Sequence, residues 1–271
     1  MKDILAKELQ KVAAREERFN RAREFLQHFI LKIMDDLQAF ESVAFIGGTA
    51  LRILYGLNRF SEDLDFSLRE NAGKFDFGNL TSEVVKKLEG VGYVVDAKPK
   101  VKMGVVSAFL RFREIMREFD ISPRKGEKLS IKVEVDTRPP VGAVVEMSPV
   151  NIDFFFKVAH YDLPSLFAGK LHAILYRGYT KGRDLYDFMW YVTKKVPVNA
   201  KLLHNAAKQT TDLDITFDRE KIITMLTEVI EKMDISSIIR ELQPLLVYSE
   251  EIRLIEKELM LKAAKDIRVV E

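Results

Sequence analysis

Apolar residues in the first part of the chain recur at the spacing of a helix. Between Asp3 and Phe40 they include Phe25, Phe29 and Ile33, set among many charged residues. Residues that are three or four positions apart share one face of a helix, so this pattern is typical of an amphipathic helix. We therefore expect either one long helix or two successive helices before the first strand.

The middle of the chain changes to short runs of β-branched and aromatic residues, separated by turn residues. Such runs predict strands. The expected strands cover residues 43–46, 64–68, 93–97, 106–112, 129–136 and 154–158. Between the second and the third of them, residues 77–89 return to helical spacing and predict a helix that crosses the sheet.

Beyond Pro164 the pattern is helical again, and the strands are expected to stop. The expected helices cover residues 165–179, 183–193, 200–209, 219–232, 235–242 and 249–265. The change of period near residue 160 predicts two domains. Residues 1–160 would form an α+β core with N-terminal helices, and residues 161–271 a helical C-terminal domain.

Composition narrows the classes of function. The chain has no cysteine, which excludes disulfides and thiol nucleophiles. Its first residues lack the apolar stretch of a signal peptide, and no run reaches the roughly 18 apolar residues that span a membrane, so we expect a cytoplasmic protein with no membrane partner. Lys and Arg total 43 against 41 for Asp and Glu, so any nucleic-acid surface must be a local patch.

A pair of glycines marks the first candidate site. Gly47 and Gly48 follow the expected strand 43–46 and precede an amphipathic segment, so they lie at a strand-to-helix turn. The first N–H groups of a helix lack intrahelical partners and carry the positive end of its dipole, which suits a phosphate. A Walker loop and a dinucleotide fingerprint are both excluded, because neither glycine spacing is present. A simple tight turn remains the alternative.

Two carboxylates follow closely. Asp63 and Asp65 are two positions apart in an extended run, so both side chains project from one face while Leu64 and Phe66 point to the core. Paired acids repel each other unless a cation lies between them, and Mg²⁺ (or Mn²⁺) held by one or two carboxylates and by substrate phosphates fits this pattern. The alternative is a solvated edge strand of alternating polarity.

A third carboxylate comes from the alternating run 130–136, in which Glu134 and Asp136 share the polar face with Lys132. If this strand pairs with the strand that carries Asp65, three acids converge. That arrangement suits two metal ions that act on the attacking and leaving oxygens. Glu134 is preferred over Asp136, but the sequence leaves the choice open.

The expected helices after Pro164 carry a second group of charges. Lys170 and Arg177 are seven positions apart and share a helix face, and Asp184 and Asp187 share another. Solvated faces, capping and salt bridges are the alternatives for these four residues. In functional terms, the lysine would contact a phosphate and the arginine would stabilise charge in the transition state.

These motifs resemble, in order, those of the AbiEii toxin family of nucleotidyltransferases, the toxin half of abortive-infection toxin–antitoxin systems. They are Gly-Gly-Thr-Ala-Leu-Arg at 47–52, Arg-Phe-Ser-Glu-Asp-Leu-Asp-Phe at 59–66, Lys-Leu-His-Ala-x-x-x-Arg at 170–177 and Arg-Asp-x-x-Asp-Phe at 183–188. The resemblance covers about residues 43–193. It implies a polymerase-β-like nucleotidyltransferase core, with a mixed sheet and flanking helices, followed by a helical region.

The residue patterns and the resemblance together give the expected roles of individual residues, with Glu134 taken from the strand pattern alone. The nucleotide-binding set would be Gly47, Gly48, Thr49, Arg52, Lys170, Arg177 and Asp187. The metal ligands would be Asp63, Asp65 and Glu134, and the catalytic set would be these three acids with Lys170 and Asp184. Between the two later acids, Asp184 is the preferred catalytic group.

The expected activity is transfer of a nucleotide from a nucleoside triphosphate to an acceptor hydroxyl, with Mg²⁺ as the cofactor. The resemblance implies transfer RNA as one acceptor and a cognate antitoxin as a partner. Two other classes stay open: a nucleotide-binding module that acts through its antitoxin, and a metal-dependent phosphohydrolase.

Overall fold

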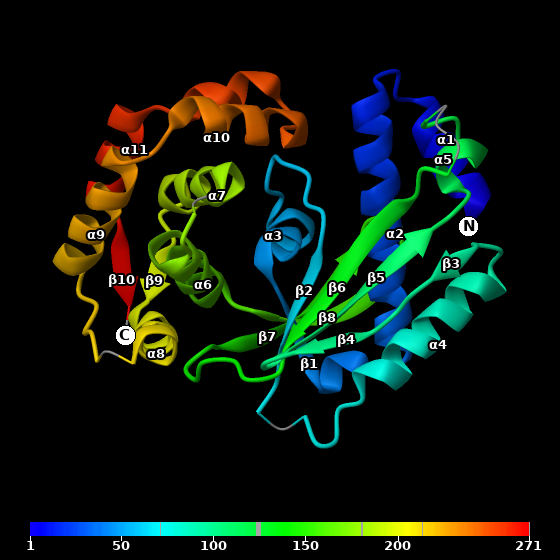
Figure 1. Ribbon diagram of the computed structural model, residues 1–271, viewed down its shortest axis with the longest axis horizontal. Coiled ribbons are helices and arrows are strands. Elements are labelled where there is room, and N and C mark those ends of the chain that lie inside the picture. The colour runs from blue at the N-terminus through cyan, green and yellow to red at the C-terminus, as the bar shows by residue number, and fades with distance from the viewer. Residues whose placement is uncertain (71, 123–125, 180, 213, 271) are drawn as a thin grey trace. The chain divides into compact units, whose positions relative to one another are not determined.

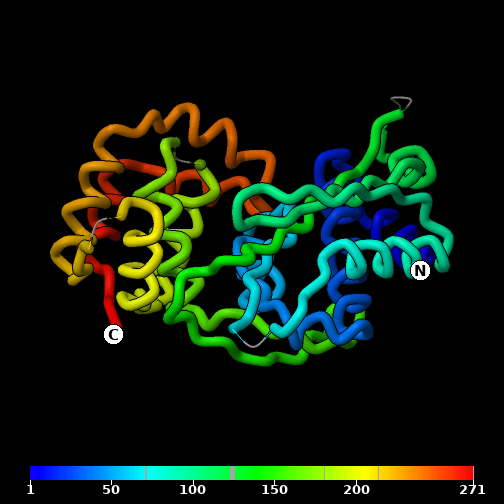
Figure 2. The backbone as a smooth tube through the Cα atoms, turned by 60° about the horizontal axis from the view of Figure 1, so that its bottom comes forward, coloured from blue at the N-terminus to red at the C-terminus, as the bar shows by residue number. Residues whose placement is uncertain are grey.

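A computed structural model describes residues 1–70, 72–122, 126–179, 181–212 and 214–270. The chain divides into two compact units. The strand unit comprises Met1–Leu54, Phe60–Arg138 and Met147–His160, and the helical unit comprises Tyr55–Arg59, Pro139–Glu146 and Tyr161–Glu271. Figure 1 labels the elements of both units, and Figure 2 shows the same backbone from another side.

The strand unit contains one large mixed sheet. Its strands are β1 Val43–Ile46, β2 Leu64–Leu68, β3 Val95–Asp96, β4 Lys100–Lys102, β5 Val105–Phe112, β6 Leu129–Asp136, β7 Val145–Asn151 and β8 Phe155–Tyr161. They lie in the order β3-β5-β6-β2-β1-β8-β7, and β4 pairs with β5 beside β3. The pairs β2–β6 and β1–β8 are parallel, whereas β1–β2 and β5–β6 are antiparallel.

Helices cover one face of this sheet. The helices and helical turns of the strand unit are α1 Lys2–Gln10, α2 Arg15–Asp36, η1 Ala39–Glu41, α3 Gly47–Tyr55, α4 Phe77–Gly90 and α5 Ile115–Glu118. Contacts of α2 with β6 and of α4 with β5 place these two helices on the same face (Figures 1 and 2). Alternation along β6 explains why the helices pack on this face, because the apolar side chains of Ile131 and Val133 project from it and are buried.

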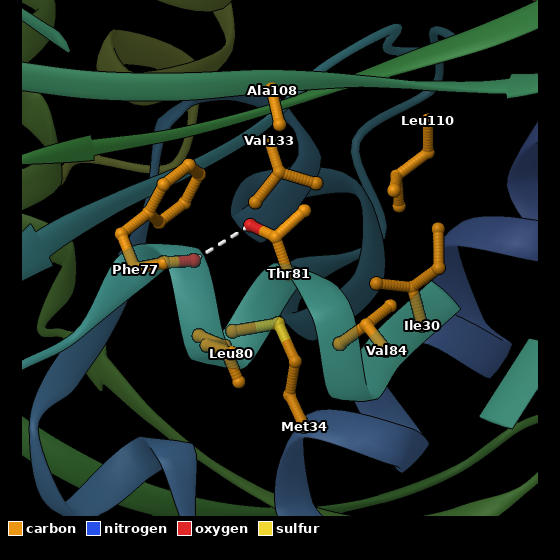
Figure 3. Close-up of a pocket in the computed structure, with 9 residues that line it drawn as sticks. All are labelled: Ile30, Met34, Phe77, Leu80, Thr81, Val84, Ala108, Leu110 and Val133. Atoms are coloured by element: carbon orange, nitrogen blue, oxygen red, sulfur yellow. Dashed lines mark hydrogen bonds between the residues drawn. The ribbon is translucent and has the colours of Figure 1, made fainter. Parts of the chain in front are cut away.

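The packing between these helices and the sheet leaves a small cavity. Ile30 of α2, Leu80 of α4 and Val133 of β6 are among its lining side chains (Figure 3). The hydroxyl of Thr81 donates to the carbonyl of Phe77 at 2.7 Å and is thereby satisfied within α4. A volume of about 10 Å³ is roughly that of one water-sized probe, so the cavity is a packing gap.

The helical unit surrounds a short two-stranded sheet. Its α-helices are α6 Leu163–Tyr176, α7 Gly182–Thr193, α8 Ala200–Thr211, α9 Arg219–Glu231, α10 Ile235–Leu242 and α11 Lys257–Lys265, with the 3₁₀ helices η2 Gln243–Leu245 and η3 Ser249–Leu254. The strands β9 Pro197–Asn199 and β10 Arg268–Val270 pair in parallel. Side-chain caps begin several of these helices: Asp162 accepts from the Ser165 N–H and Asn199 from the Leu202 N–H, each at 2.9 Å.

The expected mixed sheet with flanking helices, followed by a helical region, is confirmed. The first forty residues form two helices rather than one. Two strand predictions were wrong in detail. The strand expected at 93–97 shrinks to Val95–Asp96, and the one expected at 154–158 begins later and continues to Tyr161.

Some elements were missed. Strands do not stop at Pro164, because β9 and β10 follow it, and β4 and β7 were not predicted. β9 contains a proline and spans three residues, and β7 contains Pro149, so neither shows a continuous β-favouring run. The single helix expected over 249–265 is a 3₁₀ helix and a separate α11. In the described part of the chain, we find no helix with the length and apolar character needed to cross a membrane.

Candidate active site

Gly47 is the point at which the strand unit turns from β1 into α3. The strand ends at Ile46 and the helix starts at the next residue, so the first N–H groups of α3 follow the sheet directly. Gly47 has φ +80°, a conformation that strongly favours glycine. A β-carbon at this position would lie 2.6 Å from Oδ2 of Asp65. The glycine therefore brings the start of the helix against a carboxylate.

The two acids are held at the beginning of β2. Asp63 immediately precedes the strand and Asp65 is its second residue, while Leu64 and Phe66 are buried as the alternation predicts. The Thr49 hydroxyl, itself buried, donates to the backbone carbonyl of Asp63. This hydrogen bond joins the first turn of α3 to the acid-bearing segment, so Gly47, Thr49, Asp63 and Asp65 form one local structure.

Sheet register favours Glu134 over Asp136 as the neighbour of this pair. β2 and β6 run in parallel, with Asp65 opposite Glu134 and Ser67 opposite Asp136. Side chains at paired positions project from the same face, so Glu134 lies beside Asp65 across one strand spacing of about 4.8 Å. Asp136 lies two residues further along β6, opposite Ser67. Burial raises its pKa, against a hydrogen bond of 2.9 Å from the Arg138 N–H that lowers it.

Lys132 is an unpredicted member of this group. Its ammonium donates to the Glu134 carboxylate from the same face of β6. Partial burial lowers the pKa of Lys132, but the hydrogen bond and charge of Glu134 outweigh it, with additional attraction from Asp63 and Asp65, so the pKa is raised. Within the described residues, no three acid or histidine side chains gather closely enough to hold a metal ion by themselves. The alternating run had already placed Lys132 on the polar face.

Arg52 of α3 was expected to bind nucleotide, and in the structure it contacts Glu24 and Phe60. Its Nε donates to Glu24 of α2 at 2.7 Å, and its guanidinium lies 5.1 Å from the centre of the Phe60 ring. The arginine therefore fixes α3 against α2 close to the glycine turn.

The helical unit gathers the second predicted group. Lys170 of α6 places its Nζ 2.7 Å from Oδ1 of Asp184 and 2.8 Å from Oδ2 of Asp187, both on α7. Its side chain is 11% exposed, and the two carboxylates are almost fully buried. The i, i+3 spacing of the two aspartates thus serves to present both to one lysine.

Arg59 completes this cluster and was not predicted as a site residue. It lies in the segment that leads to the acid pair, yet it belongs to the helical unit, where it is 1% exposed. Nε and Nη2 of Arg59 donate to the two oxygens of Asp187 at 2.7 and 2.6 Å, a two-point ion pair. The only indication in the sequence was that Arg59 is the first residue of the motif at 59–66.

Arg177 pairs with the other aspartate. Its Nη1 donates to Oδ2 of Asp184 at 2.7 Å. Burial alone would raise the pKa of Asp184, but the charge and hydrogen bond of Lys170 and the charge of Arg177 hold it below its ordinary value. The expected salt bridge between Arg177 and an aspartate is present. Arg59, Lys170 and Arg177 thus surround the two aspartates and offset their charges.

The histidines have structural partners. His172 Nε2 lies 2.9 Å from the Thr210 hydroxyl, and burial lowers the pKa of this histidine. His160 is 1% exposed, with Nε2 2.9 Å from the hydroxyl of Ser148. The candidate chemistry therefore rests on carboxylates, ammonium and guanidinium groups and backbone N–H groups.

Comparison with known proteins gives a family match over most of the chain. A family model described as "Nucleotidyl transferase AbiEii toxin, Type IV TA system" matches residues 30–263. No curated protein matches the sequence. Two solved structures from Helicobacter pylori are similar. A candidate nucleotidyltransferase is 24% identical, with 88% of this chain and 94% of that chain covered and a TM-score of 0.48. JHP933 is 23% identical, with 90% and 94% covered and a TM-score of 0.48.

Proposed function

Because the chain belongs to the AbiEii nucleotidyltransferase toxin family of type IV toxin–antitoxin systems, we propose that it transfers a nucleotide from a nucleoside triphosphate to an acceptor hydroxyl with the help of Mg²⁺. The observation that carries this proposal is the contact between Gly47 and the Asp65 carboxylate. It places the first N–H groups of α3, which have no intrahelical partners and suit a phosphate, beside a carboxylate that suits a divalent cation. A tight turn alone requires no acid at that point.

The donor set fits a divalent cation. Asp63 and Asp65 supply carboxylate oxygens, and substrate phosphates complete a typical Mg²⁺ shell. Glu134, opposite Asp65 in register, is proposed to join them only when the ion and the substrate are bound. When bound, the ion neutralises charge on the phosphates and carboxylates. Manganese suits the same oxygen ligands.

The reaction forms one bond and breaks one. The oxygen of the acceptor hydroxyl attacks the α-phosphorus, the bond from that phosphorus to the α–β bridging oxygen breaks, and pyrophosphate leaves. The hydroxyl proton passes to solvent. The backbone N–H groups from Gly47 to Thr49 hold the triphosphate, and Thr49 fixes the acid segment to them. Catalysis then comes mainly from positioning and from charge complementarity.

The helical unit supplies the remaining roles. Lys170 contacts the nucleotide as a point charge, and Arg177 supports it. Asp184 keeps both cations in place through its two oxygens, and Asp187 does the same for Lys170 and Arg59. On this proposal, Asp184 and Asp187 act through Lys170, whereas Asp63 and Asp65 meet the reacting groups.

The acceptor and the partner are further parts of the proposal. We propose transfer RNA as the acceptor, since a 3′-terminal hydroxyl is the nucleophile the reaction needs, and a cognate antitoxin as the protein that restrains the activity. Both can be tested with the full chain.

The test uses each labelled nucleoside triphosphate in turn with Mg²⁺ and total transfer RNA. Wild type should release pyrophosphate and label the RNA, and EDTA should stop both. Asp63→Asn should lower the rate by about a hundred-fold or more, as loss of a charge-stabilising group does. Glu89→Gln, at an exposed position of α4, is the matched control and should behave like wild type.

Three outcomes contradict the proposal. Absence of transfer with every nucleotide, together with triphosphate binding that is independent of metal and of Asp63, would favour a binding module that acts through its antitoxin. Shortened rather than extended RNA would identify a phosphohydrolase. Full activity of Asp63→Asn would exclude the assigned acid pair.

A further inference from the structure

A row of side chains crosses the face of the sheet opposite α2 and α4 and ends at the acid pair. Register places Lys100 of β4 opposite Ser107 of β5, Ser107 opposite Glu134 of β6, and Glu134 opposite Asp65 of β2. Paired residues share a face, so these four side chains lie in line on the face opposite α2 and α4. Three strand spacings, about 14 Å, separate the backbones of Lys100 and Asp65.

An aromatic ring lies beside this row. Phe109 is two residues along β5 from Ser107 and therefore on the same face, where it is 38% exposed. Its neighbours on β5, Ala108 and Leu110, are buried on the helix-covered face. The guanidinium of Arg111 lies 5.7 Å from the centre of the Phe109 ring. Arg111 is also paired with Asp96, whose Oδ1 lies 3.5 Å from Nη1 of the arginine. Phe109 therefore presents a flat apolar surface beside a guanidinium that already has a carboxylate partner.

Lysines extend the same face at its edge. Lys100 and Lys102 are both exposed and, two positions apart on β4, project to the same side. Within the described residues neither has an acidic partner. A tight turn at Met103 and Gly104, both with positive φ, joins β4 to β5 and holds the lysines in a defined hairpin.

Protection of an edge strand would explain part of this pattern. Lysines on an edge strand hinder pairing with other chains, and β4 is such a strand. That role does not require an exposed phenylalanine on the neighbouring strand, nor a row that leads to Glu134 and Asp65. Backbone charge neutralisation combined with aromatic stacking is instead typical of surfaces that bind single-stranded nucleic acid.

We propose that Lys100, Lys102, Phe109 and Arg111, here named the acceptor face, bind the single-stranded end of a nucleic-acid acceptor. One base stacks on Phe109, the lysines contact the phosphates, and the terminal hydroxyl lies toward Asp65. The inference rests on the proposed function, since it assigns a substrate class to the same carboxylates. Sequence preference is expected to be weak, because every base has a face that can stack.

Binding can be measured apart from turnover. The probe is a short single-stranded RNA of mixed sequence with fluorescein at its 5′ end, titrated with the full-length protein and followed by anisotropy over a series of salt concentrations. Phe109→Ala should weaken binding by about five-fold to a hundred-fold. The double variant Lys100→Gln, Lys102→Gln should flatten the plot of log K against log salt by about 1.4, because each phosphate contact on a single strand contributes about 0.7.

Matched controls come from the same unit. Phe155→Ala removes another exposed phenylalanine, from β8, and Lys86→Gln removes an exposed lysine from α4. Neither should change RNA affinity or salt dependence. Thermal melts check folding. If Phe109→Ala does not fold, Phe109→Leu keeps apolar bulk without an aromatic ring and should show most of the loss.

The inference is overturned if Phe109→Ala or Phe109→Leu binds RNA like the Phe155→Ala control, or if duplex RNA binds as tightly as single-stranded RNA. Failure of the proposed function looks different. In that case wild type transfers no nucleotide, yet its RNA affinity still depends on Phe109. A different result would reject the acceptor face alone. In that case transfer depends on Asp63, but the KM for the acceptor is unchanged in Phe109→Ala and in the double variant Lys100→Gln, Lys102→Gln.

Discussion

Gly47 lies so close to Asp65 that a β-carbon at residue 47 would stand 2.6 Å from Oδ2 of the aspartate. The start of helix α3 and the carboxylate of strand β2 are thereby kept in contact. The geometry depends on the absence of a side chain and on a positive φ, and both can be changed by one substitution.

Gly47→Ala should therefore damage folding and activity together. The positive φ costs an alanine about 1–3 kcal/mol, and the clash with Asp65 must move the carboxylate. We expect a lower unfolding free energy by at least about 1 kcal/mol and a large loss of nucleotide transfer. Urea denaturation and the transfer assay measure the two effects. Gly90→Ala, at a helical glycine with open space around it, should be neutral or slightly stabilising.

Breaking the Arg59–Asp187 pair should destabilise the helical unit strongly. Both side chains are buried, so Asp187→Asn leaves a guanidinium without its full counter-charge, at a cost of about 3–5 kcal/mol. The double variant Arg59→Leu, Asp187→Leu should recover part of this loss, and a double-mutant cycle in urea measures the coupling. Lys86→Gln, which breaks an exposed pair with Glu83, should cost less than about 0.5 kcal/mol. If Asp187→Asn and Lys86→Gln lowered the unfolding free energy by equal amounts, the strong contribution of the buried Arg59–Asp187 pair would be refuted.

Acid should weaken the fold through Asp184. Its folded-state pKa is below the ordinary value of 3.8, so its contribution to stability is present above that pH and is lost as the pH falls through the folded-state pKa. Wild type should be more stable than Asp184→Asn at neutral pH, and the difference should shrink below about pH 4. Unfolding free energies at several pH values measure it. A difference that is constant with pH would contradict the prediction.

Lys132 should act as an internal counter-ion of the carboxylates. Lys132→Met removes the ammonium that contacts Glu134, so repulsion among the acids should lower stability by up to about 1 kcal/mol in the absence of divalent ions. Mg²⁺ should then stabilise the variant more than it stabilises wild type, because binding to the folded state alone raises the melting temperature. Melting curves with and without Mg²⁺ compare the two. Lys86→Met, on α4, should leave the Mg²⁺ response of wild type unchanged.

Local patterns in the sequence determined much of the strand unit. Alternation along 129–136 predicted which side chains of β6 are buried, and the apolar run at 43–46 followed by two glycines predicted the turn into α3. Strand and helix periods depend on the nearest residues, so they can be inferred from a single sequence. The short strands β4 and β9 escaped this reasoning, because three residues are too few to show a period.

The sequence by itself determined which residue types carry the candidate chemistry and in which motifs they occur: the glycine turn, the acid pair, and the lysine, arginine and aspartates of α6 and α7. Only the tertiary structure decided that Asp65 faces Glu134 rather than Asp136, that Lys132 contacts Glu134, and that Arg59 binds Asp187. Strand register and long-range ion pairs join residues distant in the chain. A shift of one residue in register exchanges the two faces of a strand, so these partners follow from packing of the whole unit.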